Sequence, residues 1–258
     1  MKRILSVMMF CSLLLVIAVG TTYGQAYSRI SYATVEQPVI DGEWTTPTEW
    51  VDGMQTNATA NFVFRSTWDT IGTYGEAGFS AITRWIVEVL DDTTDDDADY
   101  LVMCLDGDQS GGTAPAVGDF KLVIEGDGTL SFYQGTGSAW EVATPDTGAI
   151  VFSTTVNDSP VSSTAHRIYE FNINKSATNP ALGIQWNFRL AAVDDSGSGE
   201  QMWPPASDAD VPDGWGMEDY SSDTIPEGFT FTVMVVLSSI SLIVGSRYLQ
   251  KRSTKKEQ

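Results

Sequence analysis

Histidine, cysteine and basic residues are scarce in this 258-residue chain, and each scarcity excludes a class of protein. One histidine, His166, and two cysteines are too few ligands for a typical zinc site. Cys11 lies in an apolar segment near the start, so Cys104 alone remains in the rest of the chain and has no disulfide partner there. The sequence contains neither a Gly-x-Ser-x-Gly nucleophile motif nor a phosphate-binding glycine loop. We therefore expect a protein without catalytic activity.

Positive charge is equally scarce, because 34 Asp and Glu residues face only 14 Lys and Arg residues, giving a net charge of −20. Half of the basic residues lie near the two ends, so the middle of the chain is more acidic still. Such a surface repels nucleic acid and anionic lipid and attracts cations. The acidity fits two interpretations: adaptation to a saline exterior, or binding of cations by some of the carboxylates.

Long apolar runs occur only near the two ends of the chain. Lys2 and Arg3 precede an apolar stretch and a small-residue segment, which predicts a secretory signal peptide over residues 1–26. A second run, 229–245, has no charge and is followed by basic residues, which predicts a transmembrane anchor over 229–249 and a cytoplasmic tail over 250–258. The intervening part is therefore expected at the outer face of a cell membrane, with the C-terminus cytoplasmic unless the anchor is cleaved.

The middle of the chain shows short apolar runs broken by Gly, Asp, Ser and Pro, without a helical period, which predicts an all-β domain. The sequence Gly126-Asp127-Gly128 between two alternating runs predicts a β-hairpin over 119–135. Nine strands are expected in total, at 29–35, 60–65, 79–90, 100–105, 120–125, 130–134, 150–155, 167–173 and 186–193. Their number and spacing predict a two-sheet β-sandwich of jelly-roll or immunoglobulin type over 27–200, followed by an acidic linker rich in Pro and Gly over 201–228.

One acidic segment has the pattern of a cation-binding loop. Asp106-Gly107-Asp108-Gln109-Ser110-Gly111-Gly112 supplies alternate oxygen ligands and a glycine bend, as calcium requires, and Asp119 follows. The closing Glu of an EF-hand is missing, since Val117 stands at its position. We predict a calcium site in a β-loop, formed by Asp106, Asp108, Ser110 and Asp119. The alternative is a solvated acidic loop without metal.

Eight tryptophans are many for one domain, and indole rings are the usual stacking surface for sugars. Trp44, Trp50, Trp85 and Trp186 lie in or beside predicted strands and are expected in the core. Three others lie in Gly- and Pro-rich segments where burial is less expected, and these are the predicted carbohydrate-binding residues: Trp140, Trp203 and Trp215.

Several motifs together resemble a known family. The opening Val39-Ile40-Asp41-Gly42 with tryptophan following, the segment 99–106 and the segment 169–173 resemble the family 9-like carbohydrate-binding modules (CBM9-like) of the DOMON-like superfamily. The resemblance implies a β-sandwich that binds carbohydrate, often with structural calcium, in which Asp41, Gly42 and Trp50 have structural roles. The Ile-Pro-Glu-Gly segment 225–228 before the apolar run resembles PEF-type C-terminal sorting signals of archaeal surface proteins, which implies a sortase-type processing enzyme as a partner.

The sequence therefore favours a non-catalytic cell-surface module that binds carbohydrate or a cell-wall glycan and is stabilised by calcium. Two alternatives stay open. One is a structural acidic coat protein without a small ligand. The other is a domain that binds b-type haem, for which the candidate ligands are Met103, His166, Met202 and Met217.

Overall fold

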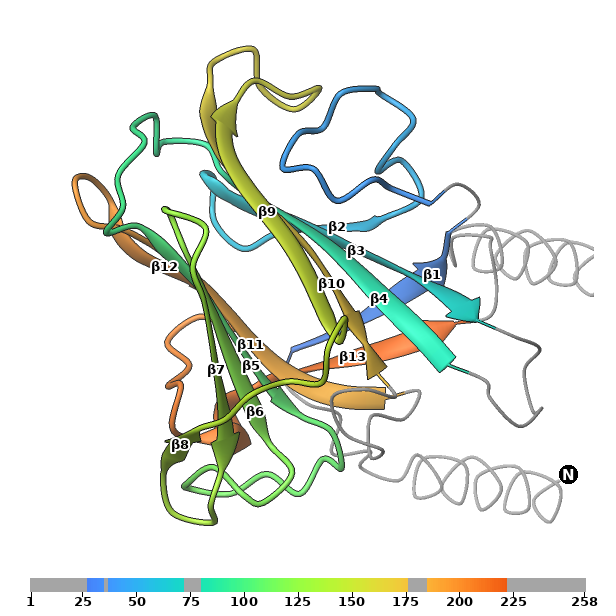
Figure 1. The fold of residues 1–258 in the computed structure, drawn as a ribbon, viewed down its shortest axis with the longest axis vertical. Helices are drawn as coiled ribbons and strands as arrows, with labels where there is room; N and C mark the ends of the chain where they lie inside the picture. The colour runs from blue at the N-terminus through green and yellow to red at the C-terminus, as the bar shows by residue number, and fades with distance from the viewer. Residues whose placement is uncertain (1–26, 35–36, 72–79, 176–184, 222–258) are drawn as a thin grey trace, which may run out of the picture.

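The computed structural model describes residues 27–34, 37–71, 80–175 and 185–221 (Figure 1). The predicted signal peptide 1–26, anchor 229–249 and tail 250–258, and the sorting motif at 225–228, lie outside these residues. In the part that is described, no helix has the length and apolar character needed to span a membrane.

The regular secondary structure of the described residues is almost entirely β, as the sequence predicts. Each of the nine predicted strands is present, and four further strands add to them. In chain order the strands are β1 (Ser28–Ala33), β2 (Met54–Asn57), β3 (Phe62–Ile71), β4 (Ser80–Val89), β5 (Tyr100–Asp106), β6 (Phe120–Glu125), β7 (Leu130–Gly135), β8 (Trp140–Val142), β9 (Ile150–Asn157), β10 (His166–Asn174), β11 (Gln185–Asp194), β12 (Gly199–Trp203) and β13 (Gly216–Ser221), with one 3-10 turn, η1 (Pro212–Gly214).

The strands form one continuous mixed sheet, where the sequence predicted two separate sheets. Its order is β8-β7-β6-β5-β11-β13-β1-β3-β4-β10-β9, with β12 beside β11 and β2 beside β3. The parallel pair β1 and β13 joins the two halves, and the sheet curls so that the halves lie against each other as a sandwich (Figure 1). Composition and alternation predict the strands but cannot show that two of them bridge the layers.

The core lies between the two halves and is rich in aromatic rings. Trp85 on β4 packs against Phe188 on β11 with ring centroids 5.1 Å apart, although three strands separate β4 from β11 in the sheet. Both side chains are fully buried. Truncation of a buried aromatic ring of this kind typically costs about 3–5 kcal/mol, so these contacts hold the halves together.

The sheet continues beyond residue 200, where the sequence placed the start of a linker. β13 lies in the middle of the sheet, between β11 and β1, and Trp215 just before it is 1% exposed. Composition hides this strand because its inward residues include a charged one, Glu218, which is fully buried and lies 3.3 Å from Arg29. A strand whose buried face is partly charged does not show the apolar alternation used to find strands.

The Asp-Gly turn at the start of the domain is fixed by a buried carboxylate. Glu170 on β10 accepts hydrogen bonds from the backbone N–H groups of Asp41 (3.1 Å) and Gly42 (2.9 Å) and from the indole N–H of Trp50 (2.7 Å). Gly42 has a φ of 90°, a conformation that favours glycine. Trp50 is fully buried. The structure thus agrees with the structural roles expected for Asp41, Gly42 and Trp50.

Basic side chains of the described residues are directed inward. Five are almost completely buried and two, Arg65 and Lys121, are half-buried. The buried ones are Arg29, Arg84, Arg167, Lys175 and Arg189. Since none of the described Lys and Arg residues is fully exposed, the outer charge of this part of the chain comes from carboxylates.

Candidate metal centre and ligand-binding surfaces

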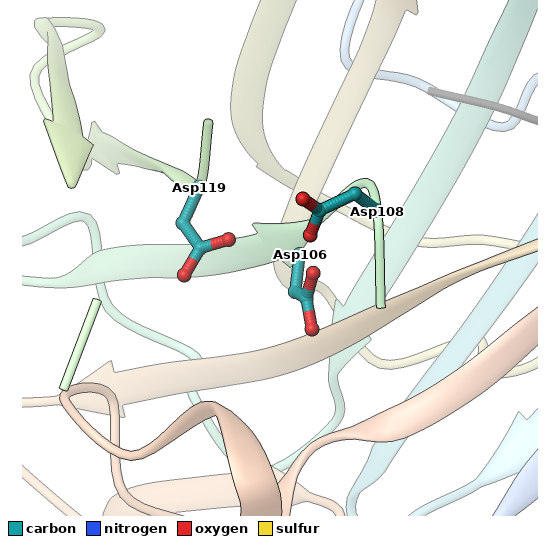
Figure 2. Close-up of side chains that lie close together, drawn as sticks. All are labelled: Asp106, Asp108 and Asp119. Atoms are coloured by element: carbon teal, nitrogen blue, oxygen red, sulfur yellow. The ribbon is translucent and has the colours of Figure 1, made fainter. Parts of the chain in front are cut away.

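The predicted acidic residues meet at one end of the β5–β6 pair. Asp106 is the last residue of β5, Asp119 immediately precedes β6, and Asp108 lies in the turn between them. Because β5 and β6 are antiparallel, with Leu105 opposite Phe120, the residues that follow and precede them come together. One carboxylate oxygen from each of the three aspartates lies within 4.8 Å of the others (Figure 2).

Asp106 is held by the loop that follows it. Its carboxylate accepts backbone N–H bonds from Ser110 (3.1 Å) and Gly111 (2.9 Å), and a bond from the side-chain amide of Asn187 (3.3 Å) on β11. Gly111 and Gly112 have positive φ values of 62° and 116°, which the tight loop requires and glycine allows. The loop therefore fixes the position of the Asp106 carboxylate, and the carboxylates of Asp108 and Asp119 lie next to it.

Asp119 has one oxygen occupied and one without a partner. Its Oδ2 accepts the N–H of Ala116 at 2.8 Å, whereas Oδ1 is buried and has no hydrogen-bond partner within the described part of the chain. The side chain is only 1% exposed. The Oδ1 of Asn187, which contacts Asp106 through its amide nitrogen, is also buried and lacks a described partner. Buried oxygens without donors are costly unless a cation or water supplies the missing interaction.

The pKa values of the three carboxyl groups are all shifted from their usual range. Burial raises the pKa of Asp119 to about 7, with a further increase from the charges of Asp106 and Asp108, against the Ala116 hydrogen bond that lowers it. Burial also raises the pKa of Asp106, while the Ser110 hydroxyl lowers the pKa of the exposed Asp108. A bound cation would stabilise all three in their charged form.

The ligand atoms fit a hard cation. All are oxygens, and calcium binds six to eight oxygens on flexible loops. The alternative of a solvated acidic loop does not describe Asp106 and Asp119, which are 0% and 1% exposed. Ser110 takes part by donating its backbone N–H to Asp106 and Asp108. Sequence reasoning missed Asn187, because polar residues alternate with apolar ones at the start of β11 (Gln185, Asn187, Arg189) and nothing singles out the amide at 187.

The three tryptophans predicted to bind carbohydrate lie in two separate places. Trp203 ends β12 and is 6% exposed in the main core, where its ring stacks on Phe188 at 4.5 Å. Trp215 is 1% exposed on the outer face of β5. Both are buried, contrary to the expectation from their Gly- and Pro-rich surroundings, because β12 and β13 bring these surroundings into the sheet.

Trp140 is the half-buried member of the three. It stacks on Trp215 with ring centroids 6.4 Å apart and planes 5° from parallel, and its indole N–H bonds to Asp210 at 2.8 Å. The Lys121 ammonium lies 5.0 Å from its ring and 4.8 Å from that of Tyr133. Whether any of the three tryptophans binds carbohydrate stays a prediction.

Two of the four candidate haem ligands, Met103 and His166, lie in positions that do not suit ligation, whereas Met202 and Met217 are half-buried. Met103 is fully buried in the aromatic core. His166 is fully buried, and both of its ring nitrogens are engaged, Nδ1 with the Thr164 carbonyl at 2.8 Å and Nε2 with Glu88 at 3.1 Å. Cys104 is an inert core residue, since burial raises the pKa of its thiol to about 12.

Comparisons with known proteins give a similarity of fold. No protein-family profile matches the chain, and no curated protein matches it. Among solved structures, a carbohydrate binding module family 9 (CBM9) from Caldicellulosiruptor kristjanssonii in complex with cellotriose is similar at a TM-score of 0.48 and 15% identity, covering 76% of this chain and 95% of that one. The same module in complex with glucose gives a TM-score of 0.46, 15% identity and coverage of 76% and 97%. Similarity of this extent does not place a ligand site.

Proposed function

We propose that this protein is a non-catalytic binding module of the cell surface, that its ligand is carbohydrate, and that calcium stabilises its fold. The observation that carries the proposal is the acidic centre. Asp106 and Asp119 are buried side by side, and Oδ1 of Asp119 has no donor in the part of the chain that the structure describes, an arrangement that an oxygen-binding cation would complete. The metal ligands in this proposal are Asp106, Asp108 and Asp119, with the side-chain amide oxygen of Asn187 (Oδ1) nearby.

For the ligand, the support is an aromatic side chain beside polar groups at the surface. Trp140 has part of its indole accessible, next to Asp210, Lys121 and Tyr133. Sugar sites combine an aromatic surface for C–H groups with carboxylates and amides for hydroxyls. The proposed location, anchored at the outer face of the cell membrane with a sortase-type enzyme as a partner, rests on the sequence segments 1–26 and 225–249.

A second candidate function is a structural acidic coat protein. It is supported by the inward placement of the described basic residues, which leaves an outer surface charged with one sign. Such a surface repels copies of itself and keeps a crowded coat hydrated. The two functions differ at Trp140, because carbohydrate binding requires its indole ring and the role of a coat protein does not.

The test is a glycan-array screen of the protein, run with calcium and again with a chelator. We expect specific binding that weakens on chelation, because the metal loop is less ordered without its cation. Retention on isolated cell envelopes, compared between wild type and Trp140→Ala, is the second measurement. A blank array from folded protein, with equal retention of both proteins, would favour the coat protein.

A further inference from the structure

A pocket of about 410 Å³ lies away from the metal centre, between the segment that follows the Asp-Gly turn and the turn after β9. Ligand pockets for small molecules are typically about 300–1,000 Å³. Eight residues line it: Glu43, Trp44, Thr45, Pro47, Asn157, Asp158, Ser159 and Pro160. None of the three aspartates of the metal centre lines this pocket, and neither do the tryptophans predicted to bind carbohydrate, Trp140, Trp203 and Trp215.

The first wall is fixed by the sheet beneath it. The turn at Gly42 is held by Glu170, and the Thr155 hydroxyl on β9 donates to the Gly42 carbonyl at 2.6 Å. Trp44, next in the wall, is 5% exposed and donates its indole N–H to the Thr46 carbonyl at 2.7 Å. The Arg65 guanidinium lies 5.0 Å from the Trp44 ring. This wall therefore has a defined shape without a ligand.

The second wall is fixed by a buried pair. The Ser159 hydroxyl donates to Glu88 at 2.5 Å, and Glu88 also contacts His166. Within the turn, Ser159 and Ser162 exchange backbone hydrogen bonds of 2.9 and 3.2 Å. A pocket whose two walls are already ordered loses little conformational entropy when it binds a ligand.

The chemistry of the lining excludes anions and favours hydroxyl groups. No basic side chain lines the pocket, whereas Glu43 and Asp158 both do. Among the described residues neither carboxylate accepts a hydrogen bond, so both are available to donors on a ligand. Trp44, Pro47 and Pro160 supply apolar surface between these polar groups. A molecule with several hydroxyls on a ring bearing C–H groups matches this lining.

We propose that this pocket binds one neutral pyranose ring of a saccharide, with ring hydroxyls donating to Glu43 and Asp158 and the C–H surface against the two exposed prolines, Pro47 and Pro160. The Asn157 amide adds a further polar group on the same rim. This assignment rests on the proposed carbohydrate-binding function and names its place and the kind of ligand. The proposed pocket does not include Trp140, which lies on β8.

The experiment uses the full chain in a detergent without a sugar head group, titrated calorimetrically with glucose, cellotriose, xylotriose, mannotriose and, as an anionic control, glucuronate. The test variant is Glu43→Gln combined with Asp158→Asn, and the matched control is Glu141→Gln combined with Asp127→Asn, two exposed carboxylates outside the pocket. We expect at least one neutral saccharide to bind, glucuronate to bind more weakly than glucose, and the test variant to lose at least tenfold in affinity while still unfolding in a cooperative thermal transition.

Three results would overturn the assignment of this pocket, and they differ in whether the proposed carbohydrate-binding function also fails. If the test variant binds the saccharide as wild type does while Trp140→Ala loses it, the pocket is not the site but the carbohydrate function stands. If no saccharide binds to folded wild-type protein, the function fails together with the pocket. If the test variant loses one equivalent of calcium and keeps its saccharide affinity, Glu43 and Asp158 form a cation site instead.

Discussion

Two clusters of aspartates in this domain are arranged in opposite ways. In the first, the guanidinium of the buried Arg167 on β10 lies between three carboxylates. Its Nε is 3.7 Å from Oδ2 of Asp92, its Nη1 is 3.1 Å from Oδ1 of Asp95 and its Nη2 is 3.3 Å from Oδ2 of Asp99. In the second, Asp106, Asp108 and Asp119 lie close together, and none of the ion pairs of the described residues involves them. Both clusters stand where loops meet the ends of strands, and both contain fully buried carboxylates.

The two clusters differ in the source of the positive charge that their carboxylates face. A buried carboxylate needs a counter-charge or several hydrogen-bond donors. Arg167 supplies the charge in the first cluster, and its Nη2 also donates to the carbonyls of Thr94 and Asp96, each at 3.3 Å, so that it ties the loop together. The second cluster has backbone donors for Asp106, but among the described residues Oδ1 of Asp119 has no hydrogen-bond partner. A cation from outside would supply the interaction that this oxygen lacks.

The largest expected effect comes from removing the internal cation. Arg167→Met leaves buried carboxylates unpaired, which typically costs about 3–5 kcal/mol in the free energy of unfolding. Urea unfolding of the variant measures this. Because the variant has two acid-only clusters, added calcium should restore part of the loss, and Arg167→Lys should lie between the two. A variant as stable as wild type, with or without calcium, would mean that Arg167 does not neutralise the cluster.

The second prediction concerns the external cation. Calcium at a hundred times its dissociation constant should stabilise the wild-type protein by about 2.7 kcal/mol, and a chelator should reverse this. Asp119→Asn removes a ligand and should abolish the gain, whereas Asp127→Asn, an exposed turn residue, should keep it. Thermal unfolding with and without calcium gives the comparison. An equal calcium effect in both variants would place the ion elsewhere.

Glu170 represents a third arrangement, in which hydrogen-bond donors alone satisfy the carboxylate. Three N–H groups point at its two oxygens, so Glu170→Gln must set an amide N–H against at least one of them. We expect a loss of about 1–3 kcal/mol in unfolding free energy. Glu49→Gln is the control, since Glu49 also accepts backbone N–H bonds but lies where water can replace them. Equal losses would show that burial of Glu170 is not the cause.

The predictability of these clusters from sequence follows from the range of the interactions. The hairpin at 120–135 and the loop after Asp106 depend on neighbouring residues, and the sequence predicts them well. Arg167 and Glu170 act on residues more than sixty positions away, so no local pattern reveals them. Strand β13 and the burial of Trp203 and Trp215 depend on the closure of the sheet, which composition does not encode.

The smallest expected effect concerns His166, the single imidazole in the chain. Burial lowers its pKa, but hydrogen bonds with Glu88 and the Thr164 carbonyl, and the charges of Glu88 and Asp158, outweigh this and raise the pKa above its usual value. In the unfolded chain the imidazole has a pKa of about 6.5. The charged pair therefore contributes its full stability below about that pH and loses it as the pH rises through the higher pKa of the folded protein.

His166→Asn should flatten this pH dependence, because an amide can still donate to Glu88 but does not titrate. Melting temperatures between pH 5 and pH 9 at constant ionic strength give the measurement, and the difference between wild type and variant isolates the histidine from the many carboxylates. A parallel displacement of the two curves would contradict the raised pKa. A difference between the curves that shrinks as the pH rises above neutral would support it. Glu88 would then be a buried carboxylate whose counter-charge depends on pH, unlike the carboxylates of the two aspartate clusters.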